Sequence, residues 1–158
     1  GASCGLNGPT LIRGSQHCDN TTIVDHLVPH TACSEVFKGV LDDKARSVFQ
    51  GKIVVHKDAQ KTDGRQHCKT LLLSDDAEVN AKPELEIYAD DVKCAHGATV
   101  GEIDETALFY LRSRGLPEKQ ARSLLIESFL GEALENIEAD DISTVLADMI
   151  SGWLSEED

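Results

Sequence analysis

The sequence has few aromatic residues, no long apolar run and no Cys-x-x-C pair, and each absence argues against a class of protein. Aromatic residues make up 4% of the 158 residues, so aliphatic side chains must fill the core. No apolar run approaches the roughly 18 to 20 residues that span a bilayer, and no signal-peptide core opens the chain. The five cysteines are odd in number, which argues against a secreted disulfide framework and, without Cys-x-x-C, against a structural zinc site. A reducing, cytoplasmic environment is the prediction.

Positive charge is also scarce. Lys and Arg number 15 against 28 Asp and Glu, giving a formal net charge of −13. A nucleic-acid or anionic membrane surface needs clustered basic residues, so neither partner is expected. Apolar residues make up 41% of the chain, which is enough for a packed core. The chain begins at Gly1 without an initiator Met, and we expect it to be a segment of a longer protein.

The sequence changes character near Gly101, which predicts two domains. Residues 1–102 have short apolar runs, such as Ile53–Val55 and Leu71–Leu73, separated by turn signals. Such closely spaced runs of three or four residues favour the coils of a β-solenoid. The pattern alone does not exclude a β-sandwich. A solenoid cut in mid-array exposes an apolar end, so capping by another chain, or a homodimer of the isolated segment, is expected.

Residues 103–158 carry 13 of the acidic residues and indicate three amphipathic helices. The first is predicted over residues 105–114, capped by Asp104 and followed by Gly115. The second begins at Pro117, and its apolar stripe continues to Ile137. A third helix follows a cap at Asp140 or Asp141. These stripes either pack only on each other or provide a docking surface.

Paired carboxylates suggest acid–base catalysis, but their positions do not support it. The pairs are Asp42-Asp43, Asp75-Asp76 and Asp90-Asp91. Adjacent residues in an extended segment point to opposite faces, and Asp is common in turns because its side chain bonds the local backbone. We therefore predict turns at all three, and a further turn at residues 61–64 in which Gly64 supplies a positive φ. No Gly-x-Ser-x-Gly, His-Glu-x-x-His or Walker-type loop is present, and no catalytic residue is predicted.

Cys94 and His96 are the candidate metal ligands. Apolar residues occupy odd-numbered positions through Leu85 and Ile87 and even-numbered positions from Val92 onward. One corner between two solenoid faces would produce this change. Cys94 and His96 then project from one side of one strand, about 6 to 7 Å apart along the chain. A thiolate and an imidazole suit iron, zinc or an iron–sulfur cluster, although two ligands are half of a set. A half-buried Cys beside a hydrogen-bonded His remains an alternative interpretation.

The segment Lys82–Gly101 closely resembles the signature of the SufB/SufD family, and Phe109–Gly115 matches the helix that follows it there. Upstream, Phe49–Ile53, Ala59–Gly64 and Leu71–Ser74 fall in the family's order and spacing, so that the likeness covers roughly residues 17–137. Cys94-Ala95-His96-Gly97-Ala98 is similar to the SufD branch; SufB-type chains have Glu in place of Gly97 and lack the Cys.

The resemblance implies a right-handed parallel β-helix core (residues 1–102, C-terminal coils only) followed by a C-terminal helical domain (residues 103–158). It implies a non-enzymatic scaffold subunit of the cytoplasmic SufBCD complex for iron–sulfur cluster assembly. SufB would pair through the β-helix, and the SufC ATPase would dock on the helices, for which Phe109, Tyr110, Arg112 and Arg114 are the candidate contacts. Cys94 and His96 would share a nascent cluster with SufB. No cofactor is expected to bind this chain tightly by itself, only iron or a transient cluster in the assembled complex.

Two other functions remain open. A structural adaptor would use Cys94 and His96 merely to fill an interface. A carbohydrate-active β-helix enzyme would need carboxylates that converge in a groove and aromatic rings that stack on sugars, and the sequence favours neither feature.

Overall fold

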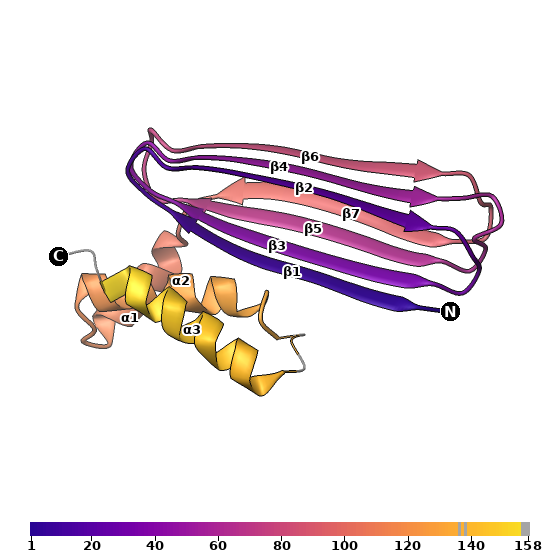
Figure 1. The fold of residues 1–158 in the computed structure, drawn as a ribbon. Coiled ribbons are helices and arrows are strands. Elements are labelled where there is room, and N and C mark those ends of the chain that lie inside the picture. The colour runs from indigo at the N-terminus through magenta and orange to yellow at the C-terminus, as the bar shows by residue number, and fades with distance from the viewer. Residues whose placement is uncertain (136, 138, 156–158) are drawn as a thin grey trace.

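The computed structural model describes residues 1–135, 137 and 139–155, which form a β-solenoid followed by three helices (Figure 1). Consecutive strands alternate between two sheets: sheet A has the order β1-β3-β5-β7 and sheet B the order β2-β4-β6, and every pairing is parallel. One coil takes 29–32 residues, as the strand registers show. The strands are β1 (Ser3–Ile12), β2 (His17–His26), β3 (Ala32–Leu41), β4 (Arg46–Val55), β5 (Asp63–Leu72), β6 (Glu78–Ile87) and β7 (Lys93–Gly101).

The predicted parallel β-solenoid is confirmed, but its strands are longer than the apolar runs suggested. Six strands have ten residues and β7 has nine, and each coil has two flat faces. Ile53–Val55 form only the C-terminal end of β4, and Leu71 and Leu72 only that of β5, with Leu73 just beyond it. Earlier in β5 the inward positions carry polar Gln66 and Thr70, which are both buried. Polar inward residues hide the alternation on which strand prediction depends.

The carboxylate pairs lie between strands, as predicted. Asp42 and Asp43 follow β3, and Asp43 has a φ of 53° while its carboxylate accepts the Gly14 N–H at 2.9 Å. The prediction for Gly64 is wrong: it lies inside β5, and Lys61 is the residue with positive φ in that turn. Gly64 faces the solenoid interior, where a side chain would meet its neighbours.

The three predicted helices are present, with shifted ends. α1 (Glu105–Ser113) is capped by Asp104, which accepts the backbone N–H groups of residues 106 and 107. α2 (Glu118–Gly131) begins one residue later than predicted and ends six residues before Ile137, because the chain tightens into turns after Gly131. α3 (Asp140–Ser155) includes both candidate caps in its first turn. None of the described helices has the length and apolarity needed to cross a membrane.

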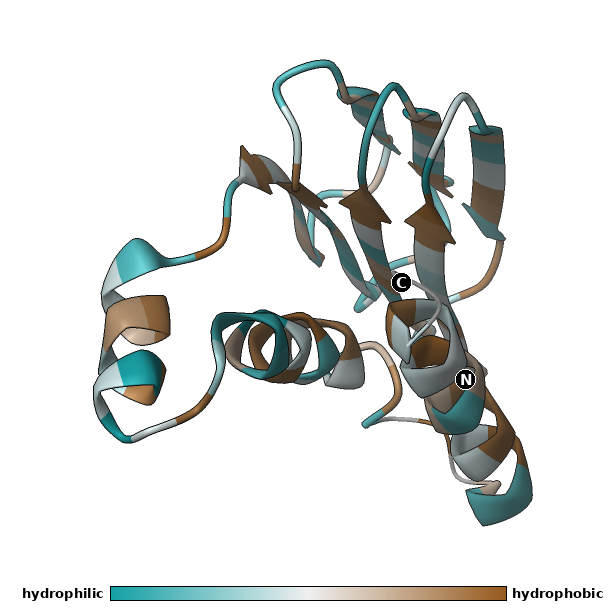
Figure 2. Cartoon of the chain, turned by 90° about the vertical axis from the view of Figure 1, so that its left-hand side faces the viewer, coloured by the Kyte–Doolittle hydropathy of each residue, from teal (hydrophilic) through white to brown (hydrophobic). Residues whose placement is uncertain are grey.

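α2 and α3 lie against the outer face of sheet A, and α1 packs on α2 (Figure 2). Two smaller apolar clusters fill the space between the sheets. Val40 of β3 and the fully buried Leu130 of α2 belong to the larger cluster, which the helices share with sheet A. A buried lysine adds to this junction: Lys38 of β3 pairs with Glu132 and donates to the Phe129 carbonyl at 2.6 Å. The helical domain is therefore joined to the solenoid by both apolar and ionic contacts.

Candidate functional site

Cys94 and His96 lie on β7, the last strand of sheet A. β7 pairs with β5 in the register Gly64↔Cys94 and Gln66↔His96, and both β5 residues are buried on the inward side. Side chains of in-register residues on neighbouring strands point to the same face. Cys94 and His96 therefore share the inward face of β7, as the sequence parity predicted.

Cys94 lies in a space that Gly64 leaves open. A Cβ atom on Gly64 would be 3.4 Å from the Cys94 Sγ and 3.6 Å from the Sγ of Cys33, one coil further back. The Cys94 side chain also packs against the cluster of Cys33, Ile53, Val55, Ala59 and Ala89. An alanine Cβ would meet both thiols at ordinary van der Waals distance, so only a side chain longer than that of alanine would push against them.

Burial disfavours the thiolate at this end of the solenoid. It raises the pKa of Cys94, partly opposed by a hydrogen bond from the Gly64 backbone and reinforced by the negative charge of Asp63. The same effect raises the pKa of Cys33 to about 11. Both groups are therefore thiols at neutral pH, and a metal that binds Cys94 must displace a proton.

His96 is exposed, although it faces inward, because sheet B has no described strand beyond β6 to cover this part of β7. Its neighbour in register, Gln66, is fully buried. Cys94 is thus half-buried in the core while His96 lies at the open end. Within the described part of the chain, no cluster of three or more His, Cys, Asp or Glu side chains could hold a metal ion. Two donors at an open edge can begin a coordination shell but do not complete one.

The four candidate docking residues lie on α1 or just after it. Phe109 is 73% exposed and Tyr110 is 55% exposed, so neither packs in the core. Arg114 donates to the Tyr110 hydroxyl at 2.7 Å and stacks on its ring, while Arg112 pairs with Glu118. The structure thus presents two exposed aromatic side chains on α1, of which Tyr110 is held by Arg114.

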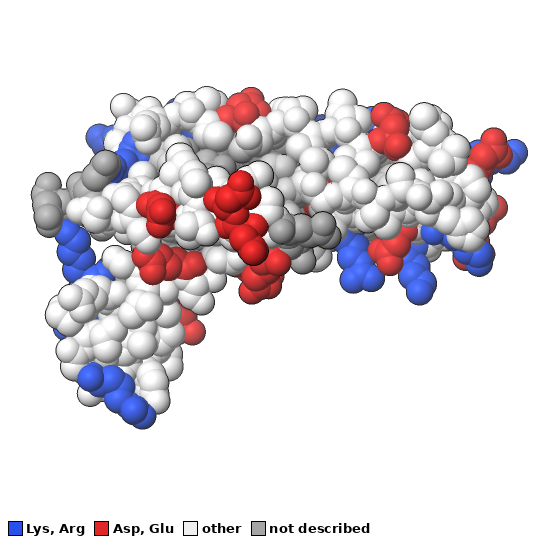
Figure 3. Space-filling model, turned by 60° about the horizontal axis from the view of Figure 1, so that its bottom comes forward, with Lys and Arg blue, Asp and Glu red and all other residues white. Residues whose placement is uncertain are grey.

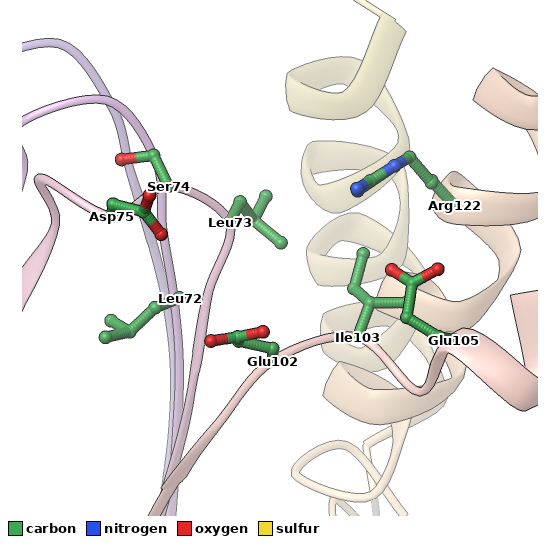
Figure 4. Close-up of a pocket in the computed structure, with 8 residues that line it drawn as sticks. All are labelled: Leu72, Leu73, Ser74, Asp75, Glu102, Ile103, Glu105 and Arg122. Carbon is green, nitrogen blue, oxygen red and sulfur yellow. The ribbon is translucent and has the colours of Figure 1, made fainter.

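A separate pocket of about 280 Å³ lies at the junction of the solenoid and the helices (Figure 4). Asp75, Glu102 and Glu105 contribute carboxylates to its wall and Arg122 a guanidinium, but no aromatic ring lines it. The pocket therefore lacks the aromatic platforms expected of a sugar-binding groove.

Figure 3 shows acidic side chains near the middle of the face in view and Lys and Arg side chains toward its ends, so that no continuous basic band crosses this face.

Sequence reasoning did not find the polar residues behind the candidate ligands. Glu35 and Gln66 lie inside the solenoid in register with His96, and Cys33 and Gly64 are in register with Cys94. The spacings of 30 and 31 residues equal one coil, so knowledge of the coil length would have aligned them.

Comparisons with known proteins place the chain in a family. Residues 1–129 match the family "SUF system FeS cluster assembly, SufBD core domain". The chain is 44% identical over 128 residues to an iron–sulfur cluster assembly SufBD family protein of Synechocystis, covering 81% of this chain and 28% of that protein. It is also 44% identical over 130 residues to the iron–sulfur cluster assembly protein SufD of Escherichia coli, covering 82% of this chain and 31% of that one.

A third relative, the chloroplastic protein ABCI7 of Arabidopsis thaliana, is 38% identical over 133 residues, which are 84% of this chain and 28% of the relative. The chain thus spans less than a third of the length of these relatives. The match extends through the solenoid, α1 and most of α2, and it includes β7 with Cys94 and His96. On this match and the parallel solenoid together, the chain belongs to the SufBD family.

Proposed function

We propose that this chain is part of a cytoplasmic, non-enzymatic scaffold for iron–sulfur cluster assembly, in which Cys94 and His96 provide two ligands and a SufB-type partner provides the rest. The position of both donors on the inward face of β7, at the open end of the solenoid, carries the proposal. A thiol and an imidazole are chemically suited to iron or an iron–sulfur cluster. The names of the SufBD relatives support a role in iron–sulfur cluster assembly.

An incomplete ligand set fits a scaffold. Four thiolates from a single chain would hold a cluster firmly, whereas ligands divided between subunits can separate and release it. The raised pKa of Cys94 acts in the same direction, because the free thiol regains its proton once the cluster leaves. The cluster is the cargo of the assembly, and this chain supplies an edge on which it forms.

The helices would carry motion from a SufC-type ATPase to this edge. Only three residues separate β7 from α1, and the middle one, Ile103, is buried in the core that the helices share with sheet A. A shift of α1 would therefore act directly on β7. Phe109 and Tyr110 are the proposed ATPase contacts because they are large, exposed and on this helix.

Anaerobic reconstitution with Fe²⁺ and sulfide tests the ligand role in the full-length chain bound to SufB- and SufC-type partners. We expect Cys94→Ala and His96→Ala to lose cluster absorbance while the complex still forms. Cys4→Ala is the matched control, because Cys4 is an exposed thiol in the first strand of the same sheet. Normal cluster formation in Cys94→Ala would refute the ligand role, and a complex that fails to form would make both residues structural, as in an adaptor.

Copurification tests the docking surface. Phe109→Ala and Tyr110→Ala should weaken retention of the ATPase and leave retention of the SufB-type partner unchanged. Leu124→Ala is the control, since Leu124 is an exposed apolar residue on α2. Equal loss in all three variants, or in none, would place the ATPase contact elsewhere.

A further inference from the structure

Three polar residues form a row across the inward face of sheet A, and the row ends at the open end of the solenoid. Glu35 on β3, Gln66 on β5 and His96 on β7 are in register, one per coil. The first two are fully buried. Glu35 Oε2 accepts hydrogen bonds from Gln66 Nε2 at 3.1 Å and from the Thr22 hydroxyl at 2.9 Å. Gln66 is thereby fixed from the side of the preceding coil.

The position of Gln66 depends on a glycine in the opposite sheet. A Cβ atom on Gly51 of β4 would lie 2.2 Å from Gln66 Nε2 and 2.7 Å from its Cδ. Real atoms do not approach so closely, so Gln66 occupies this site only because position 51 has no side chain. The absence of a side chain at position 51 thus creates the space that the Gln66 amide fills.

One end of the amide has no partner. Gln66 Oε1 is buried and accepts no hydrogen bond from the described residues. A buried acceptor without a donor is destabilising, so proteins generally supply one. The carboxylate of Glu35 needs the NH₂ end of the amide, which leaves the oxygen for another neighbour. The residue next in register, about 4.8 Å away by strand spacing, is His96.

We propose that Gln66 positions His96: when the imidazole turns inward, Gln66 Oε1, which has no partner among the described residues, accepts the N–H of one ring nitrogen and leaves the other nitrogen free as a metal ligand. Histidine ligands commonly donate their second ring N–H in this way, which fixes both tautomer and ring orientation. The inference rests on the proposed role of His96 as a ligand. It adds that Glu35 and Gly51, which hold Gln66 in place, determine the orientation of the His96 ring.

The tautomer of His96 tests this without metal. Nitrogen-15 NMR of the metal-free chain at mildly alkaline pH reports which ring nitrogen is protonated. We expect one protonated and one unprotonated nitrogen in the native protein. In Gln66→Met and Gly51→Ala, both signals should move toward the average of two exchanging tautomers. Gly5→Ala, a strand glycine with open space around it, should have no effect.

His67 is the internal control, because it lies beside Gln66 on β5 but faces outward and should keep its spectrum. In the assembled complex, Gln66→Met should weaken Fe²⁺ binding about 10- to 100-fold. Unchanged His96 signals in both variants would overturn the proposal and leave a buried water as the donor to Gln66. A shifted tautomer together with normal cluster formation in His96→Ala would keep the positioning role and refute the role of His96 as a ligand.

Discussion

Glu132 links the helices to the solenoid, and its removal should be more harmful than removal of its partner. The side chain of Lys38 is only 2% exposed and that of Glu132 is 48% exposed. Besides this pair, Lys38 has the Phe129 carbonyl and lies 4.3 Å from the centre of the Phe129 ring. Glu132→Ala would therefore leave a buried ammonium group with one neutral acceptor and a ring face.

The structure sets the size of the effect. Breaking a fully buried ion pair costs about 3 to 5 kcal/mol, whereas exchanging a buried charge for an apolar residue of similar volume is often nearly neutral. Water reaches Glu132, so we expect Glu132→Ala to lower the free energy of unfolding by about 2 kcal/mol. Lys38→Met should change it by less than about 1 kcal/mol, because the Met side chain can still pack on Phe129.

Urea denaturation of the two single variants and the double variant measures these values as a cycle. The double variant should be as stable as Lys38→Met alone, because Glu132 has little left to pair with except Lys69, at 3.2 Å on the surface. A double variant as unstable as Glu132→Ala would refute the reasoning, since the loss could not then come from an unpaired Lys38. So would a loss below about 0.5 kcal/mol in Glu132→Ala, the usual range for surface changes.

Acid provides an independent check on the same pair. The hydrogen bond from Lys38, helped by Lys69 and opposed by partial burial, holds the pKa of Glu132 below its usual range. The stabilisation is therefore complete above the unfolded pKa of about 4.3 and is lost as the pH falls through the lower folded pKa. The advantage of the native chain over Glu132→Ala should shrink across that interval.

Other changes probe the core, the thiols and a buried imidazole. Leu130→Ala should cost about 2 to 5 kcal/mol in urea denaturation, and Leu124→Ala less than about 0.5, since only Leu130 is fully buried. Under native conditions iodoacetamide should modify exposed Cys4 first and spare buried Cys33, whose pKa is about 11, until the protein unfolds; mass spectrometry would show any reversed order. Burial lowers the pKa of His26, so stability should fall as the pH drops through about 6.5, and an unchanged pH slope in His26→Gln would contradict this.

The sequence predicts the parts of this fold that depend on aliphatic residues and helix caps. Asp104 marks the start of α1, and the parity change after Asp90-Asp91 locates the corner before β7. Strand length was not predictable, because Glu35 and Gln66 occupy inward positions that normally hold apolar residues. Their burial is stabilised by contacts across coils, which a reading of single segments does not detect.

The candidate site was likewise predictable only where it depends on residues close together in the sequence. The pairing of Cys94 with His96 is local, since two residues apart on a strand share a face. What lies behind them depends on residues about 30 and 60 positions earlier, and the coil length is not visible in a chain whose coils have little similarity. Gly64 illustrates the difficulty: as a lone glycine near Asp63 it resembles a turn residue, and only the register shows that it lies inside a strand between Cys33 and Cys94.

β7 is also the strand best placed to move. In sheet A, β3 and β5 have hydrogen-bonded neighbours on both sides, whereas β7 pairs only with β5 in the described structure. Its last residue, Gly101, lies three residues from α1, and its second residue is Cys94. A pull on α1 therefore acts along a strand held at one edge, with the candidate ligands at its far end. The pairs of Glu132 with Lys38 and Lys69 hold the end of α2 on β3 and β5, so a movement of α1 alone would act on β7.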